Sequence, residues 1–267
     1  MSMVDNPGFA EALDRHFPGA VLGGEFIAET ASRLSDEGFA KDNTIACVAL
    51  CRDEVTRPLF TDVERVWGPA FSFAGLAGMV TAGRTGLAAA IHHAPIDDGR
   101  RRFVIYAMAH IGIDAAGATG WVDRPGIAEP SSTCGALVAF RNELQGGELV
   151  VEFDRYETEQ VLLKHRLLPL ITYGTVPDLV ALTKLTVTAI EDDLQEIILS
   201  LAEEWRRTGQ AMPADAAMFS GIQIHGPDGV NFVWPLGSHI EAGGDLSDYE
   251  FTAAEPGPDP RGRGTPA

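Results

Sequence analysis

Two short apolar runs constrain the fold of this chain more than any other feature. Residues 44–50 read Thr-Ile-Ala-Cys-Val-Ala-Leu, and residues 102–109 read Arg-Phe-Val-Ile-Tyr-Ala-Met-Ala. Neither run has helical spacing, and continuous apolar runs of this length are typical of strands buried on both faces, as in a parallel sheet. Helical patterns stand between and after the runs. The sequence therefore predicts an α/β fold, with a mostly parallel sheet flanked by helices.

The remaining elements follow from periodicity and from Pro, Gly and Asn signals. We predict helices over residues 7–17, 25–37, 58–67, 85–93, 134–144 and 178–207. The run after residue 218 has strand character on both sides of Pro227-Asp228-Gly229, which predicts a β-hairpin. We expect a single domain over 1–253, with its functional core at about 40–145 and a helical and hairpin C-terminal half at 146–253. The Pro- and Gly-rich tail 254–267 is predicted to be disordered.

Composition limits the class of function. The net charge is −18, from 20 basic and 38 acidic side chains, which argues against binding to nucleic acid or to an anionic membrane. No run reaches the roughly 18 apolar residues of a membrane span, and the first residues lack a secretory signal pattern. Three cysteines are too few for a disulfide framework, so we expect free thiols or thiolate ligands in a reducing cytoplasm.

Three potential zinc ligands stand at the ends of predicted elements. Cys51 follows the first apolar run, His110 follows the second, and Cys134 precedes a predicted helix. In parallel sheets, ligands bind beyond the carboxyl ends of the strands. Three such ligands leave a tetrahedral zinc one open position, as in catalytic sites. The spacing matches no compact zinc finger. From these residues alone, the cysteines could instead be small apolar core residues, as we expect for Cys47, and the histidine could be an ordinary core residue.

An ordered set of short motifs resembles a known family. The motifs are Cys-Arg-Asp-Glu-Val (51–55), Gly-Leu-Ala-Gly (75–78), Thr-Gly-Leu (85–87), His-Ile-Gly-Ile-Asp (110–114), Gly-Ala-Thr-Gly (117–120), Arg-Pro-Gly (124–126) and Cys-Gly-Ala-Leu (134–137). Weaker support comes from Ile-His-Gly (224–226) and Phe-Val-Trp-Pro (232–235). Together they are similar to the limiting-CO2-inducible B/C proteins of algae, also called theta-class carbonic anhydrases. The resemblance implies a fold like that of β-class carbonic anhydrases, a homodimer, and zinc bound by Cys51, His110 and Cys134.

The resemblance also implies an activity. We expect interconversion of CO2 and bicarbonate through a zinc-bound hydroxide, with Asp53 accepting the proton of that hydroxide. In the β class an arginine two residues after the aspartate is its partner, but this chain has Val55 there. Arg52 is our preferred substitute, and Arg57 and Arg84 are the other candidates. The family includes members that bind zinc without detectable activity, so a silent zinc-binding oligomeric subunit or a bicarbonate sensor is the alternative.

Three further residue roles can be stated from the sequence. His92 and His93 are candidates for proton relay because an unperturbed imidazole titrates near pH 6.5, although packing at a helix end explains them equally well. Glu54 would be the acid/base group if the chain were a zinc hydrolase of a larger carbonyl substrate. We do not expect a redox role with a Cys47–Cys51 disulfide, because four residues of strand separate the Cα atoms by roughly 13 Å.

Overall fold

The computed structural model describes residues 6–124, 126–209, 213–242 and 245–247, and its centre is a seven-stranded sheet. The strands are β1 (Val21–Leu22), β2 (Thr44–Ala49), β3 (Phe71–Ser72), β4 (Arg101–Gly112), β7 (Ala214–His225), β8 (Asn231–Ala242) and β9 (Asp245–Ser247). Their order is β1-β8-β7-β4-β2-β3, with β9 paired to β8. The section β3-β2-β4-β7 is parallel, whereas β8 is antiparallel to its three neighbours. A separate small sheet joins β5 (Trp121–Val122) to β6 (Ser131–Ser132).

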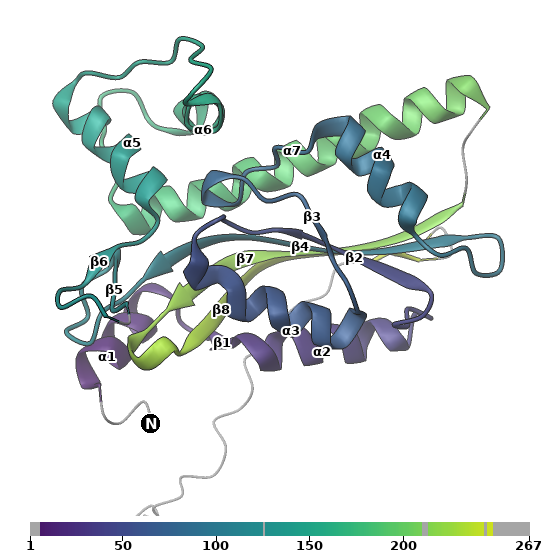
Figure 1. Ribbon diagram of the computed structural model, residues 1–267, viewed down its shortest axis with the longest axis horizontal. Coiled ribbons are helices and arrows are strands. Elements are labelled where there is room, and N and C mark those ends of the chain that lie inside the picture. Colours follow the sequence, from purple (N-terminus) through teal and green to yellow (C-terminus); the bar gives the residue numbers. More distant parts are fainter. Residues whose placement is uncertain (1–5, 125, 210–212, 243–244, 248–267) are drawn as a thin grey trace, which may run out of the picture.

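Helices cover both faces of the sheet (Figure 1). They are α1 (Pro7–His16), α2 (Gly23–Ser35), α3 (Arg57–Trp67), α4 (Gly83–His93), α5 (Gly135–Gly146), α6 (Thr158–Leu167) and α7 (Leu179–Thr208). Helices α2 and α3 lie on one face, and α4 and α7 lie on the other. Helices α5 and α6 stand on the α7 side, at the end of the sheet to which β4 runs.

Side chains alternate between two apolar cores along the central strands. Cys47 and Ala49 of β2 belong to the core on the α4 and α7 side, and so do Ile105 and Ala107 of β4. The residues between them, including Val48 and Tyr106, belong to the core on the α2 and α3 side. Because both faces of each strand are covered, both sets must be apolar, which explains the continuous apolar runs in the sequence.

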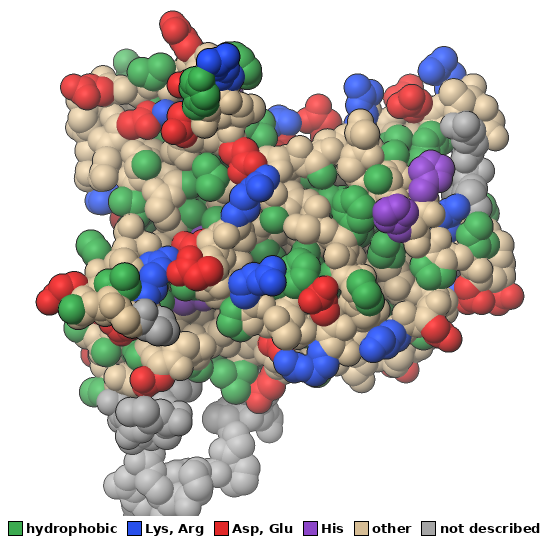
Figure 2. Space-filling view, viewed as in Figure 1, with side chains coloured by type: hydrophobic (Ala, Val, Ile, Leu, Met, Phe, Trp, Pro, Cys, Tyr) green, Lys and Arg blue, Asp and Glu red, His purple; other side chains and the backbone are tan. Residues whose placement is uncertain are grey.

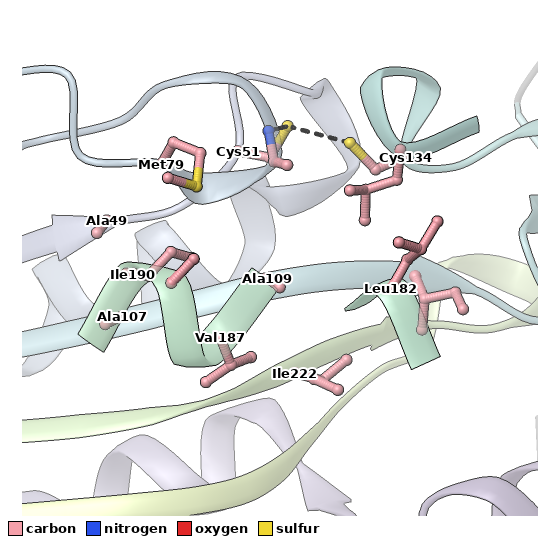
Figure 3. Packing of buried hydrophobic residues seen from close by; sticks show 14 of the residues in the cluster. Ala49, Cys51, Met79, Ala107, Ala109, Cys134, Leu182, Val187, Ile190 and Ile222 are labelled. Carbon is pink, nitrogen blue, oxygen red and sulfur yellow. Dashed lines mark hydrogen bonds between the residues drawn. The ribbon is translucent and has the colours of Figure 1, made fainter. Parts of the chain in front are cut away.

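Local signals set the limits of the longest helix. Asp178 caps the start of α7, where its Oδ1 accepts a hydrogen bond from Ala181 N at 2.8 Å. Gly209 ends the helix in the left-handed conformation, with a φ of 70°, which glycine adopts at little cost. The helix lies along the sheet, and Figure 3 shows Leu182, Val187 and Ile190 of α7 facing it.

The predicted fold class is confirmed. The sheet is flanked by helices, and the C-terminal half adds a helical segment and the β7–β8 hairpin. The two parts of the chain share one sheet because β7 pairs with β4. One boundary was wrong: β4 continues to Gly112, so His110 lies inside the strand rather than after it. Within the described residues, no helix combines the length and apolar character needed to span a membrane. The tail 254–267, predicted to be disordered, lies outside the described residues.

Candidate metal centre

Three buried side chains converge at the carboxyl ends of the parallel strands. Cys51 lies two residues beyond β2, His110 lies near the end of β4, and Cys134 is the residue that caps the start of α5. One ligand atom from each lies within 4.8 Å of the others. The two Sγ atoms are 3.9 Å apart, the contact drawn as a dashed line in Figure 3. Two thiolates on a tetrahedral zinc would be separated by roughly 3.8 Å, so the sulfur pair fits this ion.

A second histidine lies against His110. His110 Nδ1 lies 3.0 Å from Nε2 of His225 on the neighbouring strand β7. Its own Nε2 is buried and has no hydrogen-bond partner in the part of the chain that the structure describes. Burial, reinforced by the electrostatic effect of His110 and Arg124, holds the pKa of His225 well below its usual range. A neutral His225 can accept the Nδ1 proton of His110, which leaves the Nε2 lone pair free to bind a metal.

The two cysteines of the set share one proton. The hydrogen bond with Cys134 and the nearby His110 together lower the pKa of Cys51 to about 4, against the opposing effect of burial. The same bond raises the pKa of Cys134, and burial adds to that rise. Cys51 Sγ also accepts a hydrogen bond from the backbone N–H of Ala77 at 3.2 Å. The pair therefore consists of one thiolate and one thiol, and metal binding has to displace the remaining proton.

Asp53 is held by an arginine that is distant in sequence. Nη2 of Arg124, on the segment between β5 and β6, lies 3.0 Å and 3.1 Å from the two carboxylate oxygens. Nη1 of Arg124 donates to the carbonyl oxygen of Ser132 at 3.2 Å, which fixes the guanidinium. Burial raises the pKa of the Asp53 carboxyl, while His110 and Arg124 act in the opposite direction. The result is an aspartate with a fixed orientation beside the three ligands.

The expected pairing of Arg52 with Asp53 is wrong. Arg52 Nη2 lies 2.5 Å from Oε1 of Glu159 in α6. The chain bends at residues 52 and 53, and Arg52 lies against α6 while Asp53 lies against Arg124.

The other two arginines considered for this role also lie elsewhere. The guanidinium of Arg57 stacks on the ring of Phe60, with its Cζ 5.5 Å from the centroid. Arg84 reaches Ser200 at 3.5 Å. Arg124 is thus the arginine that the structure places on Asp53.

Glu54 is engaged by the same arginine. Nε of Arg124 lies 2.6 Å from Oε1 of Glu54, and this interaction lowers the pKa of the exposed Glu54 to about 2. A carboxylate of such low basicity, already paired with an arginine, is unsuited to move protons near neutral pH. The geometry gives no support to an acid/base role for Glu54.

His92 and His93 are too far away to relay protons from this site, and that prediction was wrong. They end α4, where the guanidinium of Arg101 bonds the carbonyl oxygens of Ile91 and Ala94. Arg101 begins β4 and His110 lies nine residues further on, a separation of roughly 30 Å along a strand. Figure 2 shows histidine side chains over α4, at the opposite end of the molecule from α5 and α6. His92 lies near Trp205, and His93 lies near Phe71, as expected for packing at a helix end.

Cys47 is the filler that its position predicted. It is fully buried in the core, and burial raises its pKa to about 12. It forms no disulfide. Cys47 and Cys51 lie four residues apart, yet burial raises the pKa of Cys47 whereas a hydrogen-bonding thiol lowers that of Cys51.

The fold and the site together define a class of α/β proteins built around a Cys/His/Cys set at the carboxyl ends of parallel strands. The family model of the limiting CO2-inducible proteins B/C beta carbonic anhydrases matches residues 20–241, and the chain belongs to this family.

Solved structures agree with this assignment. PtLCIB4, a homolog of the limiting CO2-inducible protein LCIB, shares 27% identity over 90% of this chain and 98% of its own, with a TM-score of 0.76. Its H88A mutant gives 26% identity, coverage of 90% and 97%, and a TM-score of 0.77. LCIB itself gives 29% identity, coverage of 89% and 97%, and a TM-score of 0.71. No curated protein matches the chain.

Two residues of the site had no role assigned from the sequence. Arg124 stands in the Arg-Pro-Gly motif and His225 stands in the Ile-His-Gly motif. Both motifs carried the resemblance, but neither lies near a ligand in sequence. The sequence offered one signal for these residues, which is that each is a charged or titratable residue within a family motif. Their position at the metal centre depends on the fold.

Proposed function

We propose that the protein is a zinc-dependent carbonic anhydrase that interconverts CO2 and bicarbonate. The observation that carries the proposal is the pairing of a Cys/His/Cys set with an aspartate held by Arg124. A purely structural zinc has no use for an oriented carboxylate beside an open position. The family description, which names beta carbonic anhydrases, supports the same activity.

Cys51, His110 and Cys134 are the residues that would hold the zinc ion. When bound, zinc lowers the pKa of a coordinated water toward neutrality and so supplies a nucleophile for CO2. His225 keeps the Nδ1 proton of His110 occupied, so that only Nε2 can bind the metal. Ala77 N–H and the buried surroundings keep Cys51 in one position.

Asp53 orients the attacking oxygen. Its carboxylate accepts a hydrogen bond from that oxygen and thereby directs a lone pair toward the carbon of CO2. Two contacts with Arg124 prevent the carboxylate from rotating, and Glu54 shares the charge of that guanidinium. Orientation of this kind contributes to catalysis by reducing the number of unproductive arrangements.

The charge of the chain suits this substrate pair. CO2 is neutral and is not repelled by a net charge of −18, whereas bicarbonate leaves a negative field readily. The homodimer and the reducing cytoplasm expected from the sequence are part of this proposal. Buried free thiols are compatible with a reducing compartment.

One alternative loses its main argument. Valine at position 55 favoured a silent zinc-binding subunit or bicarbonate sensor, because the position of the usual arginine is unfilled. Asp53 nevertheless has an arginine partner, because Arg124 lies 3.0 Å from its carboxylate. The missing arginine is therefore no longer a reason to prefer the silent subunit.

The test is stopped-flow CO2 hydration by purified protein of measured zinc content, across about pH 6.5 to 9. Asp53→Ala is the matched variant, since it leaves all three ligands in place. We expect zinc-dependent hydration in the natural chain and most of it lost in Asp53→Ala at equal zinc content. One zinc per chain with no hydration at any pH would sink the proposal in favour of the silent subunit.

A further inference from the structure

The short helix η3 (Leu76–Gly78) contacts the metal centre through its backbone. Its middle residue, Ala77, donates the N–H that reaches Cys51 Sγ at 3.2 Å. A hydrogen bond to a ligand sulfur reduces the electron density that the sulfur gives to the metal. The position of this loop therefore bears on the electronic properties of the site as well as on its shape.

The loop adopts a conformation that needs support. Ala77 has a φ of 56°, in the left-handed region that residues other than glycine rarely occupy. The next residue, Gly78, lies against β4, where a Cβ would come within 2.4 Å of the carbonyl oxygen of Met108. Strand β4 thus limits the loop on one side. Residues in such conformations persist only where their surroundings hold them.

Helix α6 holds the loop on its other side through Glu159. Oε2 of Glu159 accepts a hydrogen bond from the backbone N–H of Leu76 at 2.9 Å, next to the donor residue Ala77. Oε1 lies 2.5 Å from Nη2 of Arg52, the residue that follows Cys51. One carboxylate therefore joins the loop that donates to Cys51 to the segment that carries Cys51.

The adjacent residue extends the same arrangement to the other cysteine. The side chain of Gln160 is largely buried, and its Nε2 donates to the carbonyl oxygen of Ala136 at 3.1 Å. Ala136 is two residues after Cys134, in the first turn of α5. The first turn of α6 thus contacts the elements that present both sulfur ligands.

We propose that Glu159 is a positioning residue of the metal centre, which clamps the loop 75–78 so that Ala77 N–H remains on Cys51 Sγ. The inference rests on the proposed function only in requiring that the site holds zinc. Without Glu159, the Ala77 N–H moves away from Cys51 Sγ, and this sulfur donates more charge to the metal. The positions of the ligand atoms also become less fixed. Both metal affinity and the sulfur-to-metal charge-transfer energy should respond.

The experiment compares three variants of the full-length chain. Glu159→Ala removes the clamp. Glu159→Gln keeps an oxygen for Leu76 N–H but loses the ion pair with Arg52. Glu157→Gln is the matched control, because Glu157 is an exposed residue of the same charge two positions earlier, and its side chain makes no cap hydrogen bond. Each variant is titrated with zinc against a chelator, and the absorption spectrum of the Co²⁺-loaded protein is recorded.

We expect Glu159→Ala to bind zinc about tenfold more weakly, as for other residues that hold a metal ligand in place. Its sulfur-to-cobalt band should move to longer wavelength, because a thiolate that loses a hydrogen bond gives up its electron more easily. Glu159→Gln should give a smaller change of the same sign, and Glu157→Gln should match the natural chain. The band position reports on the sulfur itself, which a general loss of stability would not move.

The possible results separate the two proposals. If the natural chain and the Glu159 variants bind zinc equally and have the same cobalt spectrum, the proposed role of Glu159 is overturned. The proposal of carbonic anhydrase activity is not affected by that result. If the expected shifts occur but the natural chain does not hydrate CO2, the clamp stands and the proposed activity is overturned. If Glu159→Ala does not fold, unchanged affinity and spectrum in Glu159→Gln would overturn the clamp. A natural chain that binds no zinc would overturn both.

Discussion

The two halves of the chain contribute different things to the metal centre. The segment from Cys51 to Cys134 supplies all three ligand atoms and the Asp53–Arg124 pair. The C-terminal half supplies contacts that hold those groups in place: His225 behind His110, and Glu159 and Gln160 beside the two cysteines. The reactive groups of the site thus come from one region of the chain, and the contacts that orient them come from the other. The first three predictions below each change one region and use a matched residue as the control, and the last varies the pH.

The largest effect is expected from loss of a ligand. Cys134→Ser should reduce the zinc content from one ion per chain to nearly none, because a serine hydroxyl is a poor zinc ligand. Serine is also a favourable residue at the start of a helix, so α5 should remain intact. Metal analysis of the purified variant measures this directly.

Cys47→Ala is the control for that experiment. Cys47 lies in the core away from the ligand set, so its variant should keep one zinc per chain and lose about 1 kcal/mol of unfolding free energy. A full zinc content in Cys134→Ser would refute the ligand assignment.

The next effect concerns the partner of Asp53. Arg124→Ala should lower the rate of CO2 hydration by about 100-fold, because Asp53 loses both contacts that orient it. Arg52→Ala should cost much less, since Arg52 contacts Glu159 instead. Stopped-flow rates at equal zinc content distinguish the two. Equal losses in both variants would contradict the assignment of Arg124.

The histidines provide a third comparison. His225→Ala should weaken zinc binding by about 10- to 100-fold, because His110 loses the acceptor that orients it. His225→Gln should restore much of the affinity, since an amide oxygen can accept the same proton. The double variant His92→Ala, His93→Ala should bind zinc and turn over as the natural chain does. A normal affinity in His225→Ala would show that His110 does not depend on its neighbour.

The last prediction concerns the pH dependence of zinc binding. The pKa of Cys51 is lowered to about 4, so this thiol is already ionised at neutral pH, whereas the raised pKa of Cys134 keeps its proton in place. Zinc binding should therefore release one proton from the cysteine pair, and up to one more from the water that zinc would acidify. The dissociation constant should fall at least tenfold per pH unit between about pH 7.5 and 9. Calorimetry in two buffers counts the protons, and a release of three would contradict the shared-proton pair.

Much of the fold and the three residues that could hold a metal ion could be predicted from the sequence. Continuous apolar runs gave β2 and β4, and family motifs gave Cys51, His110 and Cys134. These features are local, because each depends on a few consecutive residues.

The residues that were missed depend on contacts between distant segments. Arg124 reaches Asp53 from 71 positions away, and His225 meets His110 only because β7 pairs with β4. The choice of Arg52 relied on nearness in sequence, but the chain bends there and Arg52 pairs with Glu159 of α6 instead. His92 and His93 were chosen for their pKa alone, and their distance from the site depends on the direction of β4.

The central claim can be tested most directly by exchange of ¹⁸O between labelled CO2 and water, with the zinc-loaded chain at chemical equilibrium. This measurement requires only the interconversion of CO2 and bicarbonate, and it does not depend on how protons reach the buffer. The account predicts that label loss accelerates in proportion to the zinc content and returns to the uncatalysed rate in Cys134→Ser. An uncatalysed rate from protein that carries one zinc per chain would contradict it.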